Sequence, residues 1–252
     1  MKYRETSKIV TLYTRDFGKM SVIVKGARQS KNTFGASLEP MSYVHAVVYR
    51  KEERELQTLS QCDVVHSLRA LTEDLEKMSA GITIIELVSV IAHEEEKNST
   101  LFNLLIATLT ALNDAKANPA FHLYFFEIHL ARILGFQPVF DRCISCGRSV
   151  SKQLSPDDEI PFHLGRGGPL CGHCPKGGGQ TVLISRSNLL MLEKIASCED
   201  CSDIQNFTKT AQFNANANAV MGNFLWEYLR HHVSGVRPLR STKVFSKILT
   251  AT

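Results

Sequence analysis

The chain has 252 residues, of which 44% are hydrophobic and 21% are charged, so it is long enough for one large domain or for two to three small domains with apolar cores. This composition excludes a disordered, collagen-like or low-complexity protein. Charged residues interrupt every long apolar stretch, so no segment is expected to span a membrane, and the N-terminus lacks the apolar run of a secretory signal.

The net charge of +4 conceals an uneven distribution of charged residues. Residues 1–35 hold eight basic and two acidic residues, and residues 230–252 hold five basic residues and no acidic one. By contrast, residues 36–135 hold eight basic and fourteen acidic residues, and residues 136–229 are nearly balanced with eight and nine. Two basic ends flanking an acidic middle indicate a polyanionic partner such as nucleic acid, with a solvated basic surface as the alternative.

Residues 1–65 are predicted to form a β domain. The segments rich in β-branched and aromatic residues, which predict strands, are 8–13, 20–26, 43–49 and 55–62. A turn over 16–19 joins the first two strands as a hairpin, and the basic, Gly-containing stretch 27–37 is expected to be a loop. Several short strands at this spacing suggest a small barrel or sandwich.

Residues 66–139 change to a helical period and are predicted to form a helical body. The first helix follows the start signals Thr72 and Asp74, and the second follows Ser99 as its expected cap. A third helix begins at Asn118-Pro119 and is stopped by Gly135; it is apolar over most of its circumference, so we expect it to be central. After a Cys-rich stretch, residues 181–252 return to helical patterns, with helices expected over 186–197, 204–233 and 241–249.

The Cys-rich stretch 140–180 contains two C-x-x-C knuckles with 24 residues between them, formed by Cys143, Cys146, Cys171 and Cys174. Each knuckle places two thiolates on one tight turn, and together the knuckles make the tetrahedral sulfur set that zinc prefers. Four cysteines leave no open coordination position, so the predicted zinc is structural. An iron–sulfur cluster, a rubredoxin-like iron and inert buried thiols are the alternatives.

The other potentially chemical residues favour plain structural interpretations. Cys198 and Cys201 share the knuckle spacing but have no second knuckle near them, so we expect a helix end, and Cys62 is expected to be an apolar strand residue. The run Glu94–Glu96 is expected to be a solvated face.

Seven cysteines without a signal peptide indicate the reducing cytoplasm. No P-loop, nucleophile elbow or zinc-protease motif is present. A metal-dependent enzyme is excluded by the number of ligands unless one of the four cysteines is not a ligand.

Four stretches in chain order carry a resemblance to a known family: the hairpin sequence from Glu5 to Arg28, the helix and exit from Phe121 to Pro138, the two knuckles, and Arg237-Pro238-Leu239-Arg240-Ser241 followed by Val244. The chain resembles the RecO family of bacterial DNA repair and recombination mediators over essentially its whole length. The first and third stretches alone would be weak evidence, because hairpins and knuckles occur in many proteins, whereas the four stretches in this order are specific.

The resemblance implies an α+β fold with an N-terminal OB-fold β-barrel, a helical body and a four-cysteine zinc-ribbon-like insertion. We expect these to occupy 1–65, 66–139 and 140–180, with 181–252 supplying C-terminal helices that complete the helical body. It implies a cytoplasmic, nucleoid-associated protein without enzymatic activity. Such proteins bind single- and double-stranded DNA, anneal strands, act with RecR, engage the acidic tail of single-strand-binding protein, and help RecA to load.

An OB surface reads nucleic acid through basic side chains and stacking aromatic rings. The predicted DNA-binding residues are Lys8, Arg15, Lys19, Lys25, Arg28, Lys31, Arg237, Arg240 and Lys243. Tyr13 and Phe17 are the possible stacking rings, with burial in the core as the alternative for Tyr13. The tail of single-strand-binding protein is expected in the helical body. A zinc-ribbon assembly module of transcription or translation, without annealing activity, is the alternative function.

The sequence departs from the family at its first residues. In the family another strand precedes the Glu-Thr-Ser stretch. In this sequence only Met1-Lys2-Tyr3-Arg4 precede the corresponding residues, Glu5-Thr6-Ser7. An OB barrel without that strand would expose a sheet edge, so we expect either a start assigned too late, which we favour, a truncation, or an incomplete barrel.

Overall fold

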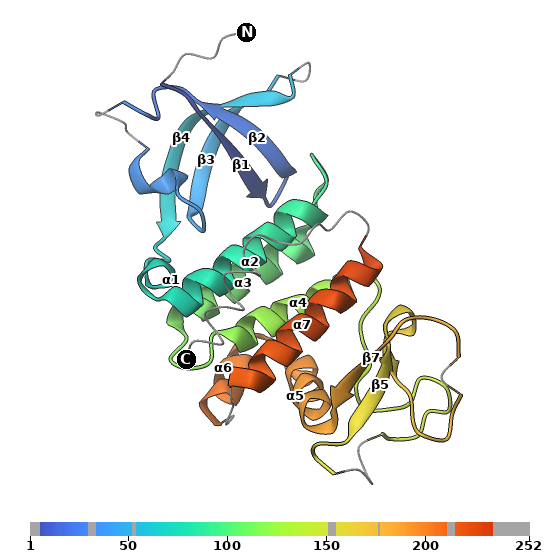
Figure 1. Cartoon of the computed structure of the whole chain (residues 1–252). Helices are drawn as coiled ribbons and strands as arrows, with labels where there is room; N and C mark the ends of the chain where they lie inside the picture. The colour runs from blue at the N-terminus through green and yellow to red at the C-terminus, as the bar shows by residue number, and fades with distance from the viewer. Residues whose placement is uncertain are drawn as a thin grey trace.

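A computed structural model of the chain describes residues 6–29, 34–51, 54–150, 155–175, 177–210 and 215–233. An N-terminal sheet is followed by a group of helices and by a small second sheet that packs at the far end of the helices (Figure 1). The fold is α+β, as predicted. The predicted helix over 241–249 lies outside the described residues.

The N-terminal sheet has four strands: β1 (Lys8–Thr14), β2 (Gly18–Val24), β3 (Tyr43–Tyr49) and β4 (Leu56–His66). Their spatial order is β1-β2-β4-β3, with β2 and β4 parallel and the other two pairs antiparallel. Only β4 differs clearly from its predicted bounds, continuing to His66. The apolar core of the N-terminal sheet includes Val22, Val24 and Leu59, and the short 3-10 helix η1 (Gly35–Leu38) adds Leu38.

Among the described strands the barrel is open between β1 and β3. Both are edge strands, and the pairings make them run in the same direction. Their inward residues Val10, Leu12, Val44 and Ala46 are only half buried, and both strands line a groove of about 980 Å³. An OB fold is a five-stranded, partly open barrel, and the four described strands are consistent with this fold.

Two of the first four helices of the body begin at a residue whose side chain caps them. The four helices are α1 (Ala70–Glu73), α2 (Leu75–Ile91), α3 (Ser99–Asp114) and α4 (Ala120–Ile133). The side chain of Asp74 accepts hydrogen bonds from the backbone N–H groups of Glu76 and Lys77, which caps α2. The predicted cap Ser99 is wrong: Asn98 caps α3 by accepting from the N–H of Leu101.

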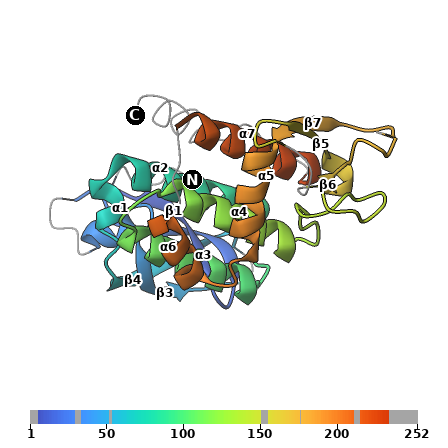
Figure 2. The same cartoon turned by 90° about the horizontal axis from the view of Figure 1, so that it is seen from below.

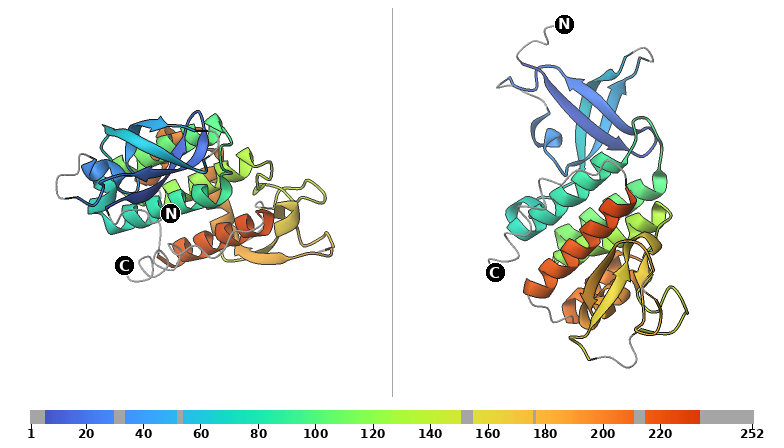
Figure 3. Two further views of the ribbon diagram at one scale, coloured as in Figure 1. Left: turned by 90° about the horizontal axis from the view of Figure 1, so that it is seen from above. Right: turned by 45° about the vertical axis from the view of Figure 1, so that its right-hand side comes forward.

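Helix α4 is the central element of the helical body, as predicted. Its residues 120–131 are all buried, because α2, α3, α5 (Arg186–Ser197), α6 (Cys201–Thr210) and α7 (Ala215–His232) surround it (Figure 3). The single helix predicted over 204–233 is wrong, since α6 and α7 are separate. The sequence around the break contains no Gly or Pro, the residues that signal a helix end.

The second sheet comprises β5 (Glu159–His163), β6 (Gly168–Pro169) and β7 (Thr181–Ser185) in the order β6-β5-β7, with the 3-10 turn η2 (Leu164–Arg166) after β5. It lies beside α5 and the end of α7 (Figure 2). Phe140, Phe162 and Ile184 belong to the same apolar core as the helices, whereas the N-terminal sheet has its own core. No helix in the described ranges has the length and apolar character needed to cross a bilayer.

Candidate functional site

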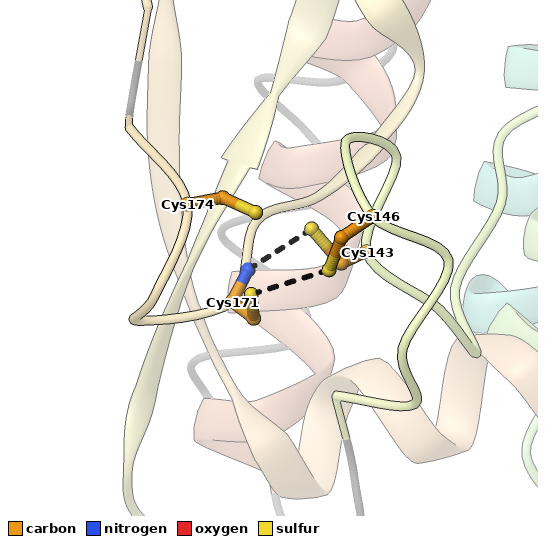
Figure 4. Close-up of side chains that lie close together, drawn as sticks. All are labelled: Cys143, Cys146, Cys171 and Cys174. Carbon is orange, nitrogen blue, oxygen red and sulfur yellow. Dashed lines mark hydrogen bonds between the residues drawn. The ribbon is translucent and has the colours of Figure 1, made fainter.

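The two predicted knuckles meet at one point of the structure. The Sγ atoms of Cys143, Cys146, Cys171 and Cys174 all lie within 4.8 Å of one another (Figure 4). The Sγ atoms of Cys146 and Cys171, one from each knuckle, are 3.7 Å apart. Ligands at a Zn–S distance of about 2.3 Å in a tetrahedron are about 3.8 Å apart. The four cysteines therefore fit the coordination of one metal ion.

The backbone around the knuckles explains why these sulfurs converge. Gly147, directly after the first knuckle, has a φ of 73° and donates its N–H to the carbonyl of Cys143 at 2.8 Å. This left-handed turn suits glycine. The N–H of Ile144 donates to the carbonyl of Pro169 at 3.0 Å and fastens the first knuckle to β6. The N–H of Cys171 points at the Sγ of Cys143 at 3.4 Å.

The electrostatics of the cluster favour a thiolate at Cys143. Burial alone would raise the pKa of this thiol, but hydrogen bonds from the backbone of Cys171, Cys146 and Ser145 outweigh burial and lower the pKa to about 6. Thiolates are the form of cysteine that binds metals. In contrast, burial and the carboxylates of Asp203 and Asp200 raise the pKa of Cys198. Cys198 and Cys201 lie at the α5–α6 junction, outside the metal cluster.

The predicted DNA-binding residues separate into two groups in the structure. Lys25, at the end of β2, and Arg28, in the loop that follows, are exposed and have no ion pair with any other described residue. The N–H of Arg28 donates to the carbonyl of Thr6 at 3.1 Å, which holds this loop against the residues that precede β1. Within the described residues, these two members of the predicted set are therefore exposed and without an ion pair.

The other described members of the set have intramolecular partners. Lys8 lies 3.8 Å from Glu39 and donates to the carbonyl of Leu38. The guanidinium of Arg15 lies over the ring of Phe102 on α3, 5.5 Å from its centre. Lys19 pairs with Glu94 at 3.7 Å. Lys31, Arg237, Arg240 and Lys243 lie outside the described residues.

The acidic run after α2 is exposed, as predicted for a solvated face, and two of its carboxylates also make ion pairs. Glu94 pairs with Lys19, and Glu95 pairs with Arg50 at 2.7 Å. The N–H of Glu95 also donates to the carbonyl of Lys19 at 2.9 Å. The run holds the β1–β2 hairpin against the helical body. Sequence analysis missed Arg50 because no local pattern links a strand end to an acid 45 residues away.

The two aromatic residues also differ in their surroundings. Tyr13 packs on Phe102 with ring centres 6.2 Å apart, and its hydroxyl donates to the carbonyl of Asn98 at 3.3 Å. Tyr13 therefore belongs to the contact between sheet and helices. Phe17, at the hairpin turn, is 50% exposed, with the guanidinium of Arg50 over its ring. Phe17 is therefore exposed at the hairpin turn, with Arg50 against its ring.

Two family models match the chain. The model described as "Recombination protein O N terminal" matches residues 1–68, and the model described as "Recombination protein O C terminal" matches residues 72–243. The break between the two models falls between the end of β4 and α2.

Curated relatives give the same result. The chain is 33% identical over 248 residues to a protein of Salinibacter ruber named "DNA repair protein RecO", covering 98% of this chain and 89% of the relative. A protein of the same name from Chlorobium luteolum is 30% identical, covering 99% of this chain and 95% of the relative. With both halves matched and relatives aligned over nearly full length, the chain belongs to the RecO family of DNA repair and recombination proteins.

Proposed function

We propose that the chain is a non-enzymatic recombination mediator that binds single- and double-stranded DNA and anneals complementary strands. The observation that carries this proposal is the pair Lys25 and Arg28, whose charges point to solvent from an OB barrel without an acidic partner among the described residues. A positive surface on an OB fold is the usual platform for nucleic-acid backbones.

The mechanism rests on electrostatics and stacking. Each cation that contacts a phosphate releases a condensed counterion, so binding should weaken steeply with salt. The exposed ring of Phe17 offers a sequence-independent stacking surface, and such a base–aromatic contact contributes about 1–3 kcal/mol. Neutralising phosphates on two strands lowers their repulsion, which is what strand annealing requires. Lys25, Arg28 and Lys31 would form the first basic patch, with Arg237, Arg240 and Lys243 as a second.

We further propose the three protein partners that the resemblance implies: RecR, the acidic tail of single-strand-binding protein, and, indirectly, RecA. We place the tail site in the helical body formed by 66–139 and 181–252. DNA held on the N-terminal domain, residues 1–65, would then lie next to a helical body that recognises protein. The site of action would be the bacterial cytoplasm at the nucleoid.

We assign a structural zinc ion to the four-cysteine element in 140–180. A closed shell of four thiolates leaves no position for substrate, so the bound ion would stabilise the fold of the element rather than act as a Lewis acid. Cys143 is buried in the common core with the helices, so the ion would fasten the second sheet to the helical body.

The experiment that tests the proposal measures annealing of complementary oligonucleotides by the full chain at low salt. We expect acceleration that disappears with rising salt. The matched variant Lys25→Glu/Arg28→Glu should lose most of the acceleration, whereas Lys116→Glu, a reversal on the α3–α4 connection, should retain it. No acceleration by the unmodified chain would favour the zinc-ribbon assembly module instead.

A further inference from the structure

The first cysteine knuckle lies against the hairpin that leads into the second knuckle. After β5 this hairpin turns through η2 and Gly167, which has a left-handed φ of 68°, and enters β6. Cys171 follows β6 after a single residue. The segment that carries the second pair of sulfurs is therefore in a position to orient the first pair.

Arg166, the last residue of η2, contacts the first knuckle through its side chain. Its guanidinium donates to the carbonyl of Ile144 at 3.0 Å and to the hydroxyl of Ser145 at 3.4 Å. These two residues are the ones between Cys143 and Cys146. Arg166 forms no ion pair with a carboxylate of the described residues, so its positive charge is not offset by a carboxylate of this part of the chain.

The backbone of the hairpin holds the same loop. The N–H of Ile144 donates to the carbonyl of Pro169 at 3.0 Å, and the N–H of Val139, ahead of the knuckle, donates to the carbonyl of Gly167 at 2.8 Å. A Cβ atom on Gly168 would overlap the Cγ2 atom of Ile144. Glycine at this position therefore lets β6 approach the knuckle closely.

The turn that carries Arg166 is itself fixed by His163, the last residue of β5, which is buried. The Nδ1 atom of His163 accepts from the N–H of Arg166 at 3.2 Å, and its Nε2–H donates to the carbonyl of Gly178 at 3.0 Å. Gly178 lies shortly after Cys174 in the sequence. Through His163, the backbone of Arg166 is thus connected to the segment that leaves the second knuckle.

We propose that Arg166 is a positioning residue for the metal, which holds the loop between Cys143 and Cys146 so that both sulfurs face the ion. None of its contacts uses a sulfur atom, so all four ligands stay free for the metal. Four thiolates leave a Zn²⁺ centre with net negative charge, which the nearby guanidinium offsets. The inference rests on the proposed zinc site and gives a metal-binding role to a residue outside its four ligands.

The first test measures the Zn²⁺ affinity of the full chain by competition with a chromogenic chelator. Arg166→Ala should bind one ion with an affinity lower by about 10- to 100-fold, as for other groups that orient metal ligands. Arg166→Lys keeps the charge and one donor group and should recover part of the loss. Arg142→Ala is the control, because it removes an exposed charge next to Cys143 whose partner is Asp141 at 3.9 Å. Unchanged affinity in Arg166→Ala, or an equal loss in Arg142→Ala, would overturn the proposal.

The second test uses Co²⁺, whose visible absorption reports the ligands that surround it, to separate positioning from ligation. Arg166→Ala should reach the spectrum of the unmodified chain at saturation, because all four sulfurs remain, but should need more Co²⁺ for half-saturation. Cys146→Ser replaces a ligand and should give a different spectrum. A changed spectrum of saturated Arg166→Ala would contradict a positioning role.

The third test disturbs the same contact without removing a charge. Gly168→Ala places a methyl group against Ile144 and should also lower the Zn²⁺ affinity. Gly172→Ala is the matched control inside the second knuckle, since a Cβ atom there would meet no atom within 4 Å. Circular dichroism checks the folding of both variants. Equal affinities in two folded variants would show that the hairpin does not hold the knuckle.

The outcomes separate this inference from the metal site on which it rests. An unmodified chain that binds no Zn²⁺ would refute the proposed zinc site. An unmodified chain that binds one Zn²⁺, with the same affinity as Arg166→Ala, would refute only the role of Arg166.

Discussion

The Nζ atom of Lys19 lies 3.7 Å from the Oε1 atom of Glu94 and donates to the carbonyl of Ser89 at 3.1 Å. Its side chain is only 18% exposed. A lysine on an OB hairpin thus serves the contact between the sheet and α2 rather than an open surface. Charge counting along the sequence cannot make this distinction, because it treats every lysine of a basic segment alike.

Because Lys19 is paired whereas Lys25 and Arg28 are exposed, removing these cations should have unequal effects on DNA binding. Lys25→Ala and Arg28→Ala should each weaken single-stranded DNA binding and reduce the logarithmic salt slope by about 0.7. Lys19→Ala should leave the slope unchanged, because its charge is already paired with Glu94. Fluorescence anisotropy over a salt series measures all three slopes. Equal losses for Lys19 and Lys25 would show that Lys19 leaves its carboxylate partner to bind phosphate.

The hairpin turn also predicts a stability effect. Gly18 has a φ of 65°, and a Cβ atom there would overlap the carbonyl group of Glu96. Gly18→Ala should therefore lower the free energy of unfolding by at least about 2 kcal/mol, from backbone strain and from the lost contact. Gly26→Ala is the matched control, since φ is 73° but the nearest atom is a flexible Gln29 side chain at 3.4 Å; it should cost about 1 kcal/mol. Urea unfolding compares them, and equal costs would contradict the close approach.

Cys174 and Cys201 each belong to a C-x-x-C pair, but replacing them should have different effects on metal binding. Cys174→Ser should reduce bound zinc from one ion per chain to a small fraction and lower the melting temperature, because three thiolates hold the ion far more weakly. Cys201→Ser should retain the full metal content, as Cys201 is outside the cluster. Metal analysis after gel filtration decides the question. Zinc retained by Cys174→Ser, or iron found in place of zinc, would contradict the assignment.

Glu127 on α4 predicts a pH dependence of stability. Burial raises its pKa from 4.5 to about 8, and its Oε2 atom has no hydrogen-bond partner in the described part of the chain. The folded state keeps a proton that the unfolded chain loses above pH 4.5. The contribution of Glu127 to the free energy of unfolding is therefore present in acid and falls by about 1.4 kcal/mol per pH unit as pH rises toward 8.

Glu127→Gln keeps a neutral side chain and should remove this dependence. Its free energy of unfolding relative to wild type should rise steadily between pH 5 and pH 8 in urea titrations. Glu159→Gln, on the exposed side of β5, is the control and should keep the wild-type pH profile. A constant difference between Glu127→Gln and wild type across this range would show that the carboxyl is already ionised in the fold.

Local signals in the sequence predicted much of this architecture. The strand bounds, the buried α4 and the convergence of the two knuckles follow from periodicity, capping and spacing, which are properties of short segments. Three features depend on contacts between distant segments and had no local signal. They are the pairing of Glu94 with Lys19 and of Glu95 with Arg50, the separation of α6 from α7, and the attachment of the second sheet to the helical core through residues such as Phe162.

The DNA-binding prediction shows the same limit at the level of single residues. Composition located a basic N-terminal segment, and the structure shows that Lys8, Arg15 and Lys19 have partners within the fold while Lys25 and Arg28 do not among the described residues. Exposure and pairing are three-dimensional properties, so a sequence can nominate such residues but cannot rank them.

The most direct test of this account is the rate of annealing of two complementary oligonucleotides in the presence of the zinc-loaded chain. The account predicts acceleration at low salt, its loss as salt rises, and its near abolition by Lys25→Glu/Arg28→Glu but not by Lys116→Glu. Annealing by the double variant at the rate of the unmodified chain would contradict the assigned surface, and no acceleration by the unmodified chain would contradict the function itself.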